Sequence, residues 1–244
     1  MLKSFAGGTI FGEQFGDGPP QVLAMHGWGR DRRDFAEVLQ GLDAVAIDLP
    51  GFGASPEPAQ ACGAWGYASL VAPILDEYEE PALLVGHSFG GRVAVHLAGM
   101  RPEKIRAIVL VAVPLLRRSG VGGSPPPVPY RLMRSLHHGG WISDGWMERA
   151  RQRYGSVDYR ASRGVMRDVL VTVVNESYES QLAEIRRPVY LLWGSEDADV
   201  PLDVAERAVA LLPQGRLTVL EGVGHHVCRE APEAVRAAVL GVVS

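Results

Sequence analysis

The feature that most constrains the fold of this chain is a short apolar run that breaks into the pattern Gly-x-Ser-x-Gly. The apolar run covers 82–85, the pattern covers 86–90, and a helix-like apolar periodicity continues to Met100. A serine in this pattern lies on a sharp turn between a strand and a helix, with its hydroxyl presented above the sheet. Ser88 is therefore a candidate nucleophile.

The two glycines of the pattern have a steric explanation. A turn this tight forces the serine towards positive φ and leaves no room for side chains two positions before or after it. Gly86 and Gly90 provide that room. The helix that follows points its free N–H groups and positive dipole end back at the turn, where an oxyanion would form. A plain glycine turn is the alternative interpretation, since the chain has 29 glycines.

Apolar runs of strand length alternate with longer helical patterns along most of the chain. After an expected N-terminal hairpin, short runs that are apolar on both faces occur at 22–25, 44–47, 82–85, 107–111, 189–193 and 217–220. Helical patterns occur at 34–40, 65–78, 89–100, 204–212 and 232–243. The alternation predicts an α/β fold with a mostly parallel sheet and helices on both faces.

Length and composition fit one such domain with an insertion. The chain has 244 residues, of which 47% are hydrophobic and 21% charged, and its net charge is −4. No apolar stretch is long enough to span a membrane, and the first residues lack the apolar core of a secretion signal. We expect a cytoplasmic protein that binds neither membrane nor nucleic acid. Cys62 and Cys228 lack metal-ligand spacing, so we expect no metal.

The region 114–187 interrupts the alternation and is interpreted as a helical cap inserted into a core made of 1–113 and 188–244. It opens with a glycine-rich and then proline-rich piece over 120–127 and continues as helix. Its longest helix has one apolar face, formed by Val165, Met166, Val169, Leu170, Val173 and Val174. This face is expected to pack on the rest of the protein or to line a cavity.

Three further polar segments follow predicted strands, at the edge where open α/β sheets bind their ligands. The first is His26-Gly27-Trp28-Gly29, whose glycines leave the backbone N–H of Trp28 unobstructed. In a serine hydrolase, one oxyanion donor is the N–H of the residue after the nucleophile, and the other comes from such a loop. Phe89 and Trp28 are therefore candidate donors. The alternative is that Trp28 only packs.

The second and third segments supply a carboxylate and an imidazole. Asp197 and Asp199 follow the strand that ends at Trp193, and either can hold a catalytic histidine in the required tautomer. His225 and His226 lie just past the last strand. The residue types leave both pairs open. Serine, aspartate and histidine in this chain order are typical of the α/β hydrolases and not of chymotrypsin or subtilisin.

The motifs HGWG, DLPGFG, GHSFGG, WGSEDADVP and GVGHH together resemble the α/β-hydrolase superfamily of serine hydrolases, from about residue 22 to the C-terminus. By position, the resemblance implies Ser88 as nucleophile, Asp197 as acid and His225 as base. Asp197 lies three residues after the glycine and four before the proline of its loop, and His225 directly follows G-x-G. Asp48, in DLPGFG, corresponds to a residue that organises the loop after the fourth strand, which implies a structural role.

The resemblance implies a cofactor-free carboxylic ester hydrolase that acts on small-molecule esters through an acyl-enzyme on Ser88. Branches that hydrolyse epoxides or haloalkanes have an aspartate nucleophile. Hydroxynitrile lyases recruit a cap lysine, whereas the lysines here are Lys3 and Lys104. Carbon–carbon hydrolases commonly have tryptophan where His226 stands. A C–C or amide bond hydrolase with the same triad remains an alternative, as does a non-catalytic ligand receptor of the same fold.

The predicted cap is rich in arginine. Residues 114–180 have ten arginines and six acids, a formal charge of +4, which leaves −8 for the remainder. Such asymmetry would steer an anionic substrate or an acidic carrier protein towards the cleft. HGWG and DLPGFG also resemble the motifs of pimeloyl-carrier-protein methyl ester esterases, which use a basic cap, although that group often has tryptophan where His87 stands. A solvated surface, in a chain with 22 arginines and 2 lysines, is the alternative.

Overall fold

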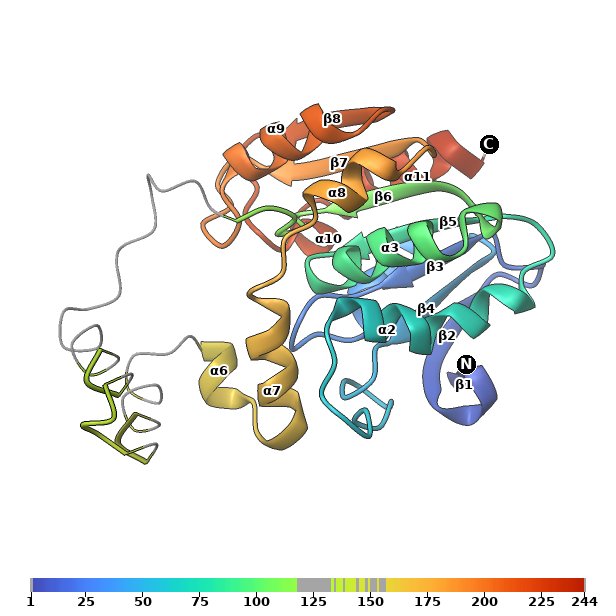
Figure 1. The fold of residues 1–244 in the computed structure, drawn as a ribbon. Coiled ribbons are helices and arrows are strands. Elements are labelled where there is room, and N and C mark those ends of the chain that lie inside the picture. The colour runs from blue at the N-terminus through green and yellow to red at the C-terminus, as the bar shows by residue number, and fades with distance from the viewer. Residues whose placement is uncertain are drawn as a thin grey trace.

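In the described part of the chain, eight strands form a single sheet at the centre of the molecule (Figure 1). The computed structural model describes residues 2–117, residues 157–243 and short pieces between 133 and 153. The strand order is β1-β2-β4-β3-β5-β6-β7-β8. β1 and β2 form the expected antiparallel hairpin, β2 pairs antiparallel with β4, and the other pairs are parallel. The predicted mostly parallel α/β sheet is confirmed.

All six strands predicted from apolar runs are present, but β8 lies at the edge of the sheet and has no buried residue, whereas we expected burial on both faces. The strands are β1 Leu2–Phe5, β2 Ile10–Phe15, β3 Val22–Met25, β4 Ala44–Asp48, β5 Ala82–His87, β6 Ile105–Val111, β7 Val189–Gly194 and β8 Gly215–Leu220. β6 begins at Ile105, two residues earlier than predicted, because the half-buried Arg106 interrupts the apolar run without interrupting the strand pairing. β5 extends to His87, so it reaches the residue before the candidate nucleophile.

Helices cover both faces of the sheet, as predicted. The α-helices are α1 Ala36–Leu39, α2 Ala64–Val71, α3 Phe89–Met100, α6 Val157–Ala161, α7 Gly164–Val173, α8 Glu179–Glu184, α9 Leu202–Leu211, α10 Val227–Glu230 and α11 Pro232–Val243. The 3-10 helices are η1 Ala6–Gly8, η2 Arg32–Phe35, η3 Ala72–Glu77 and η4 Pro102–Lys104. Helices α2, α3, α8 and α9 pack on one face, and α10 and α11 pack on the other (Figure 1). Helix α1 belongs to the same core cluster as α10 and α11.

Two of the predicted helices are divided. The pattern at 65–78 predicted one helix, but α2 ends at Val71 and η3 follows it. Pro73 explains the change, because proline lacks the N–H and its ring clashes with an α-helical carbonyl one turn earlier. The pattern at 34–40 corresponds to η2 followed by the one-turn helix α1. Helix α10 was not predicted, since its four residues are too short for a helical period to be detected.

Part of the predicted cap lies within the described residues. In α7, the side chains of Met166, Val169, Leu170 and Val173 are buried, whereas Val174, just after the helix, is 58% exposed. Helix α8 packs against α3 and α9, so the last part of the region lies in the helical layer over the sheet. The glycine- and proline-rich piece at 120–127 lies outside the described residues, and the boundaries of the cap remain a prediction.

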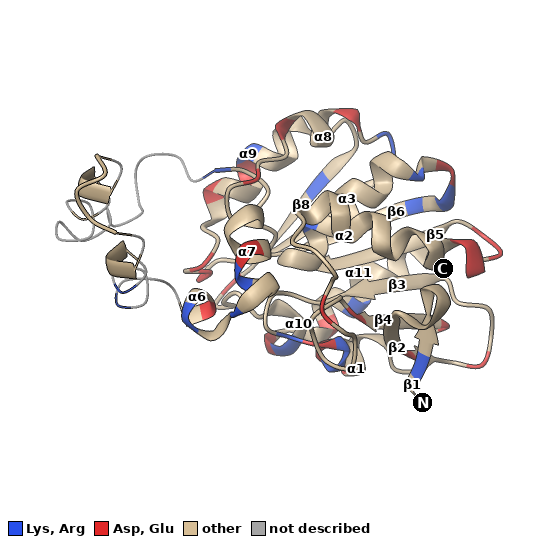
Figure 2. Ribbon diagram, turned by 60° about the horizontal axis from the view of Figure 1, so that its bottom comes forward, with Lys and Arg blue, Asp and Glu red and all other residues tan. Residues whose placement is uncertain are grey.

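The charge distribution of the described cap helices is mixed. Figure 2 shows both basic and acidic positions on α6 and α7, which correspond to Asp158, Arg160, Arg167 and Asp168. The positive charge counted over residues 114–180 is therefore not uniform along these two helices. None of the helices among the described residues has both the length and the apolar character needed to cross a membrane.

Candidate active site

The turn between β5 and α3 has the strained geometry that its sequence predicts. Ser88 has φ 47° and ψ −110°, a backbone conformation that is costly for a residue with a Cβ. A Cβ at Gly86 would lie 2.4 Å from the Cα of Gly91, and a Cβ at Gly90 would lie 2.1 Å from the carbonyl oxygen of Met25. The predicted positive φ and the need for both glycines are confirmed.

The loop after β7 brings a carboxylate against an imidazole. Oδ2 of the buried Asp197 accepts a hydrogen bond from Nδ1 of His225 at 2.8 Å. Oδ1 of Asp197 accepts the backbone N–H groups of Asp199 at 2.9 Å and of Val200 at 2.7 Å. The indole of Trp193 donates to the carbonyl of Val200 at 2.8 Å and holds the loop in place. A proton on Nδ1 leaves Nε2 of His225 as the basic nitrogen.

The structure shows which aspartate contacts which histidine, a choice that the residue types alone left open. Asp197 contacts His225 with its side chain, whereas Asp199, which is exposed, supplies a backbone N–H to the Asp197 carboxylate. His226 is also exposed, and its ring centroid lies 5.6 Å from that of His225. The pairing in the structure is therefore the one that the family resemblance implied.

A glutamate that sequence reasoning missed holds the loop around His225. Oε2 of Glu230 accepts the N–H of Gly224 at 2.7 Å, and Oε1 accepts the N–H of His226 at 3.0 Å. One carboxylate thus binds the backbone on both sides of His225. Glu230 lies in the single turn of α10, where free backbone N–H groups favour negative charge. Because α10 was not predicted from the sequence, this signal could not be recognised.

In the sequence, His87 stands out only because the pimeloyl-carrier-protein methyl ester esterases often have tryptophan at this position. Its imidazole is buried, and Nε2 donates to the backbone carbonyl of His225 at 3.0 Å. Burial lowers the pKa of His87 to about 3, so the ring is neutral in ordinary buffers. Among the described residues, Nδ1 of His87 has no hydrogen-bond partner. A Cβ at Gly27 would lie 2.8 Å from this nitrogen, so glycine is required there.

The two candidate oxyanion donors lie side by side. The rings of Trp28 and Phe89 pack edge to face, with centroids 5.4 Å apart, and Trp28 also packs on Phe52 at 5.0 Å. Trp28 therefore does pack, as the alternative interpretation held. Both residues also line the cavity that contains Ser88. Within the described residues, neither backbone N–H has a hydrogen-bond partner, so both are available to a ligand oxygen.

Buried polar groups fix the loops beneath this pair. Nε2 of His26 accepts the N–H of Leu49 at 2.9 Å, and its Nδ1 donates to the carbonyl of Gly27 at 2.7 Å. Burial lowers the pKa of His26, so this neutral tautomer persists. The carboxylate of Asp48 accepts the N–H of Arg32 at 2.8 Å and that of Ala54 at 2.8 Å. These contacts agree with the structural role expected for Asp48.

Ser88, His225 and the two donor residues line one cavity of about 770 Å³. The apolar part of the lining includes Leu170, Val173 and Val174, which lie on or just after α7. Three acids and three arginines also line the cavity: Asp158, Glu176, Asp199, Arg30, Arg92 and Arg117. Burial, with the nearby Asp199, raises the pKa of Asp158. The cavity thus combines a serine hydroxyl, an imidazole and two backbone N–H donors with a volume suited to a small molecule.

Sequence comparison places this arrangement in a known family. The alpha/beta hydrolase family matches residues 22–238, which is most of the chain. The chain therefore belongs to the alpha/beta hydrolase family, and the fold and the resemblance predicted from its motifs are confirmed.

Individual relatives differ in the activities for which they are named. The pimeloyl-[acyl-carrier protein] methyl ester esterase of Aromatoleum aromaticum is 27% identical over 241 residues, which cover 88% of this chain and 94% of that protein. A 2-hydroxy-6-oxononadienedioate/2-hydroxy-6-oxononatrienedioate hydrolase of Paraburkholderia phymatum is 28% identical over 257 residues, which cover 90% of this chain and 86% of that protein.

A solved structure shows the same fold at lower sequence identity. The thermophilic esterase from Thermogutta terrifontis superposes with a TM-score of 0.71 and 22% identity, covering 100% of this chain and 98% of its own. Such a likeness supports the arrangement of strands and helices described above.

Proposed function

We propose that this protein is a serine-dependent carboxylic ester hydrolase, with Ser88 as nucleophile, His225 as base and Asp197 as the acid that orients the base. The observation that carries the proposal is the hydrogen bond of 2.8 Å between Asp197 and His225, on the wall of the cavity that also contains the strained Ser88. Relatives named as esterases support the same reaction class.

The proposed reaction proceeds through an acyl-enzyme and needs no cofactor. Nε2 of His225 takes the proton of the Ser88 hydroxyl as Oγ attacks the ester carbonyl. The N–H groups of Trp28 and Phe89 donate to the oxyanion of the tetrahedral intermediate. His225 then gives its proton to the leaving alcohol. Water repeats the sequence with His225 again as base, which releases the acid and frees Ser88.

Asp197 supports this cycle without accepting the proton itself. Its Oδ2 holds the Nδ1–H tautomer of His225 and stabilises the imidazolium that forms during attack. Both carboxylate oxygens accept N–H donors, which keeps the group correctly aimed at the imidazole. The positive end of α3 adds to the field at the oxyanion, since α3 begins at Phe89.

The decisive experiment combines labelling with turnover. We expect a fluorophosphonate probe to label the protein once, at Ser88, and p-nitrophenyl esters of short to medium acids to be hydrolysed. The Ser88→Ala variant is expected to lose roughly a millionfold in kcat, retaining only what the oxyanion hole and binding provide. Label on another serine, or near-normal turnover by Ser88→Ala, would contradict the proposal.

A second candidate function is hydrolysis of a carbon–carbon bond with the same residues. The relatives named 2-hydroxy-6-oxononadienedioate/2-hydroxy-6-oxononatrienedioate hydrolase favour it, and the buried neutral His87 beside the base is compatible with either chemistry. A panel of esters, lactones, amides and ring-fission dienoates distinguishes these reactions. If no substrate is turned over above the buffer background while ligands still bind, the protein is a receptor of the same fold.

The ester is proposed to be a small molecule, and a finer proposal is that an acidic carrier protein presents it to the cap. Two relatives are named for a pimeloyl-[acyl-carrier protein] substrate. In the cap, the exposed Arg149 lies over the ring of Trp146 at 5.2 Å. The exposed Arg153 follows it in the sequence, and Arg151 lies outside the described residues. A solvated arginine-rich surface remains the alternative.

A further inference from the structure

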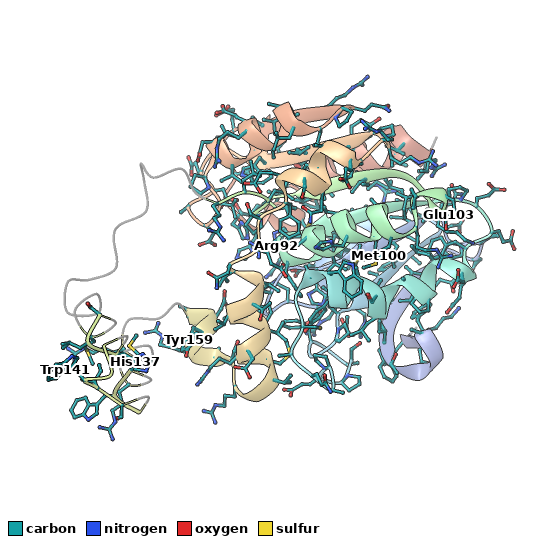
Figure 3. All side chains as sticks on the ribbon, viewed as in Figure 1. Arg92, Met100, Glu103, His137, Trp141 and Tyr159 are labelled. Atoms are coloured by element: carbon teal, nitrogen blue, oxygen red, sulfur yellow. The ribbon has the colours of Figure 1, made fainter. Side chains whose placement is uncertain are left out.

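Arg92 is a buried cation on the wall of the cavity that the proposed mechanism does not use. It lies on α3, four residues after Ser88, so the rise of a helix places the two Cα atoms about 6 Å apart along the axis. Figure 3 shows it at the end of α3 that faces α7. An arginine remains protonated even when burial lowers its pKa, as it does here. The cavity wall therefore has a permanent positive charge close to the proposed nucleophile.

The contacts of Arg92 leave its charge without a carboxylate partner. Nε donates to the carbonyl of Pro114 at 3.0 Å, Nη1 donates to the carbonyl of Val173, and the guanidinium lies 5.8 Å from the centre of the Tyr178 ring. Among the described residues, Arg92 forms no ion pair. These hydrogen bonds do not involve Nη2, and Arg92 as a whole lines the cavity.

Glu176 is the acid that interacts electrostatically with Arg92, but its carboxylate already accepts other hydrogen bonds. The carboxylate of Glu176 accepts the hydroxyl of Tyr178 at 2.5 Å and the N–H of Ala64 at 3.1 Å. A carboxylate held by two donors outside ion-pair distance of Arg92 compensates only part of the cation. Burying a cation without a charged partner is costly, so a ligand that supplies the missing negative charge would be favoured at this place.

The other cavity arginines do not offer the same opportunity. Arg30 is neutralised by a two-point ion pair with Asp34, with Nε at 2.7 Å and Nη2 at 2.5 Å from the carboxylate. Arg117 is exposed, and its Nη2 donates to the carbonyl of Asn175 at 3.1 Å. Of the three, Arg92 is thus the one that is both buried and unpaired among the described residues.

The charges are also separated within the cavity. Asp158, on α6, lines the cavity and interacts electrostatically with Asp199 and His225. Arg92 interacts with Tyr178 and Glu176, at the side formed by the end of α7. A substrate with its ester at Ser88 would have Asp158 near His225 and, elsewhere in the cavity, Arg92 with the already hydrogen-bonded Glu176 beside it.

We propose that the unpaired donors of Arg92 bind a carboxylate on the substrate, so that the cavity selects esters that contain a second, free carboxylate. This inference rests on the proposed ester hydrolysis for its kinetic test, but the anion site itself does not require turnover. A planar guanidinium with free N–H groups matches a carboxylate better than any neutral group.

The test compares esters that differ only in charge. One pair is mono-4-nitrophenyl adipate and its methyl ester, with the free carboxylate on the acyl side. The other pair is 4-butyryloxybenzoate and its methyl ester, with the carboxylate on the alcohol side. In the wild type we expect at least tenfold higher kcat/KM for the anionic member of one pair. Preference for the neutral member in both pairs would overturn the proposal, whatever the variants do.

Variants separate a binding role from a packing role. Arg92→Gln is expected to lower kcat/KM for the preferred anionic ester by roughly tenfold to a hundredfold and to change the neutral ester by less than about threefold. Arg92→Lys, which keeps the charge, should retain part of the preference. Equal losses for both esters would show that Arg92 only joins α3 to α7, and would overturn the proposal.

Arg236 provides a matched control. Its Nη1 donates to the carbonyls of Val38 at 3.0 Å and Gln40 at 2.7 Å, between α11 and α1 on the other face of the sheet. Arg236→Gln therefore removes a comparable pair of backbone contacts and should leave the charge preference intact.

A binding measurement distinguishes failure of this inference from failure of the proposed function. Adipate should raise the Tm of the wild type in a salt-sensitive manner and should not raise that of Arg92→Gln or Arg92→Lys to the same extent. If adipate shows this pattern but no ester is hydrolysed, the anion site stands and the proposed function fails. If esters are hydrolysed through Ser88 without charge preference and adipate has no effect, only the anion site fails.

Discussion

The imidazole of His87 donates from Nε2 to the backbone carbonyl of His225 across 3.0 Å, although 138 positions separate the two residues in the chain. His87 immediately precedes the proposed nucleophile, and His225 is the proposed base. The bond therefore ties the turn at the end of β5 to the loop after β8. The bond requires a proton on Nε2 of His87, and burial, which lowers the pKa of the ring, keeps Nδ1 unprotonated.

His87 should make the stability of the protein depend on pH. Its pKa is about 3 in the folded protein and 6.5 when exposed, so between these values the unfolded chain binds a proton that the folded protein does not. Stability is therefore complete above pH 6.5 and falls as the pH is lowered. The wild type should lose about 2 kcal/mol more free energy of unfolding than His87→Gln between pH 7 and pH 5.

Urea unfolding of both proteins at the two pH values provides the measurement. His26, whose pKa burial also lowers, contributes equally to both proteins and cancels in the comparison. The same loss of stability in the variant as in the wild type would mean that His87 is protonated in the folded state.

Asp197 and Asp199 should differ sharply in their effect on turnover. Asp197→Asn places an amide NH₂ or oxygen where two N–H donors and His225 now bind a carboxylate. We expect kcat to fall by around ten-thousandfold, because the histidine takes the wrong tautomer. Asp199→Asn should stay within about tenfold, since its backbone N–H is retained. Steady-state kinetics of the two variants decide the matter, and the reverse ranking would move the acid to Asp199.

Two glycines on one helix offer a direct test of the strained turn. A Cβ at Gly90 meets the carbonyl of Met25 at 2.1 Å, whereas a Cβ at Gly99 meets nothing within 4 Å. Gly90→Ala should destabilise the protein by roughly 1–3 kcal/mol or more and displace Ser88. Gly99→Ala should stabilise it by about 0.5–1 kcal/mol, as expected at an exposed helical position.

Thermal melts combined with ester turnover measure both effects. A Gly90→Ala variant with the stability and turnover of Gly99→Ala would show that the turn can relax without cost.

The carrier-protein proposal makes a prediction that depends on charge. Replacing Arg149, Arg151 and Arg153 together with glutamate should raise KM severalfold for an acyl ester on an acidic carrier protein. The effect should fade at high salt, and a neutral p-nitrophenyl ester should be unaffected. Kinetics with both substrates at two ionic strengths provide the measurement. Equal changes for the two substrates would assign these arginines to the integrity of the cap instead.

Local patterns were sufficient to predict the sheet and the strained turn at Ser88. Strands buried on both faces appear as continuous apolar runs, and the turn at Ser88 needs glycines at fixed positions, so each can be recognised from a few adjacent residues. The ends of elements were less predictable. Arg106 lies within β6 because its side chain is only half-buried, and Pro73 divides a helix that apolar periodicity alone would continue.

Several hydrogen bonds around the site join residues that are far apart in the chain, so no local sequence pattern predicts them. Asp197 and Asp199 have the same side chain, so residue type alone does not choose between them. The position in the family motif implied Asp197, and the fold shows its side chain reaching His225. Arg92 meets Pro114 and Val173, which are 22 and 81 residues away. Such partners are set by tertiary packing, so their residue types in the chain do not indicate that they meet.

The two carbonyls that bind Arg92 lie at the two ends of the segment from Pro114 to Val173. One side chain of the core thus closes this stretch of chain into a loop whose ends stay fixed whatever lies between them. Because the entropy of loop closure grows only by about 0.6 kcal/mol for each doubling of length, the interior of such a loop is free to be lengthened, shortened or exchanged during evolution. New substrate pockets can then arise over the sheet while the residues that perform the chemistry are inherited unchanged.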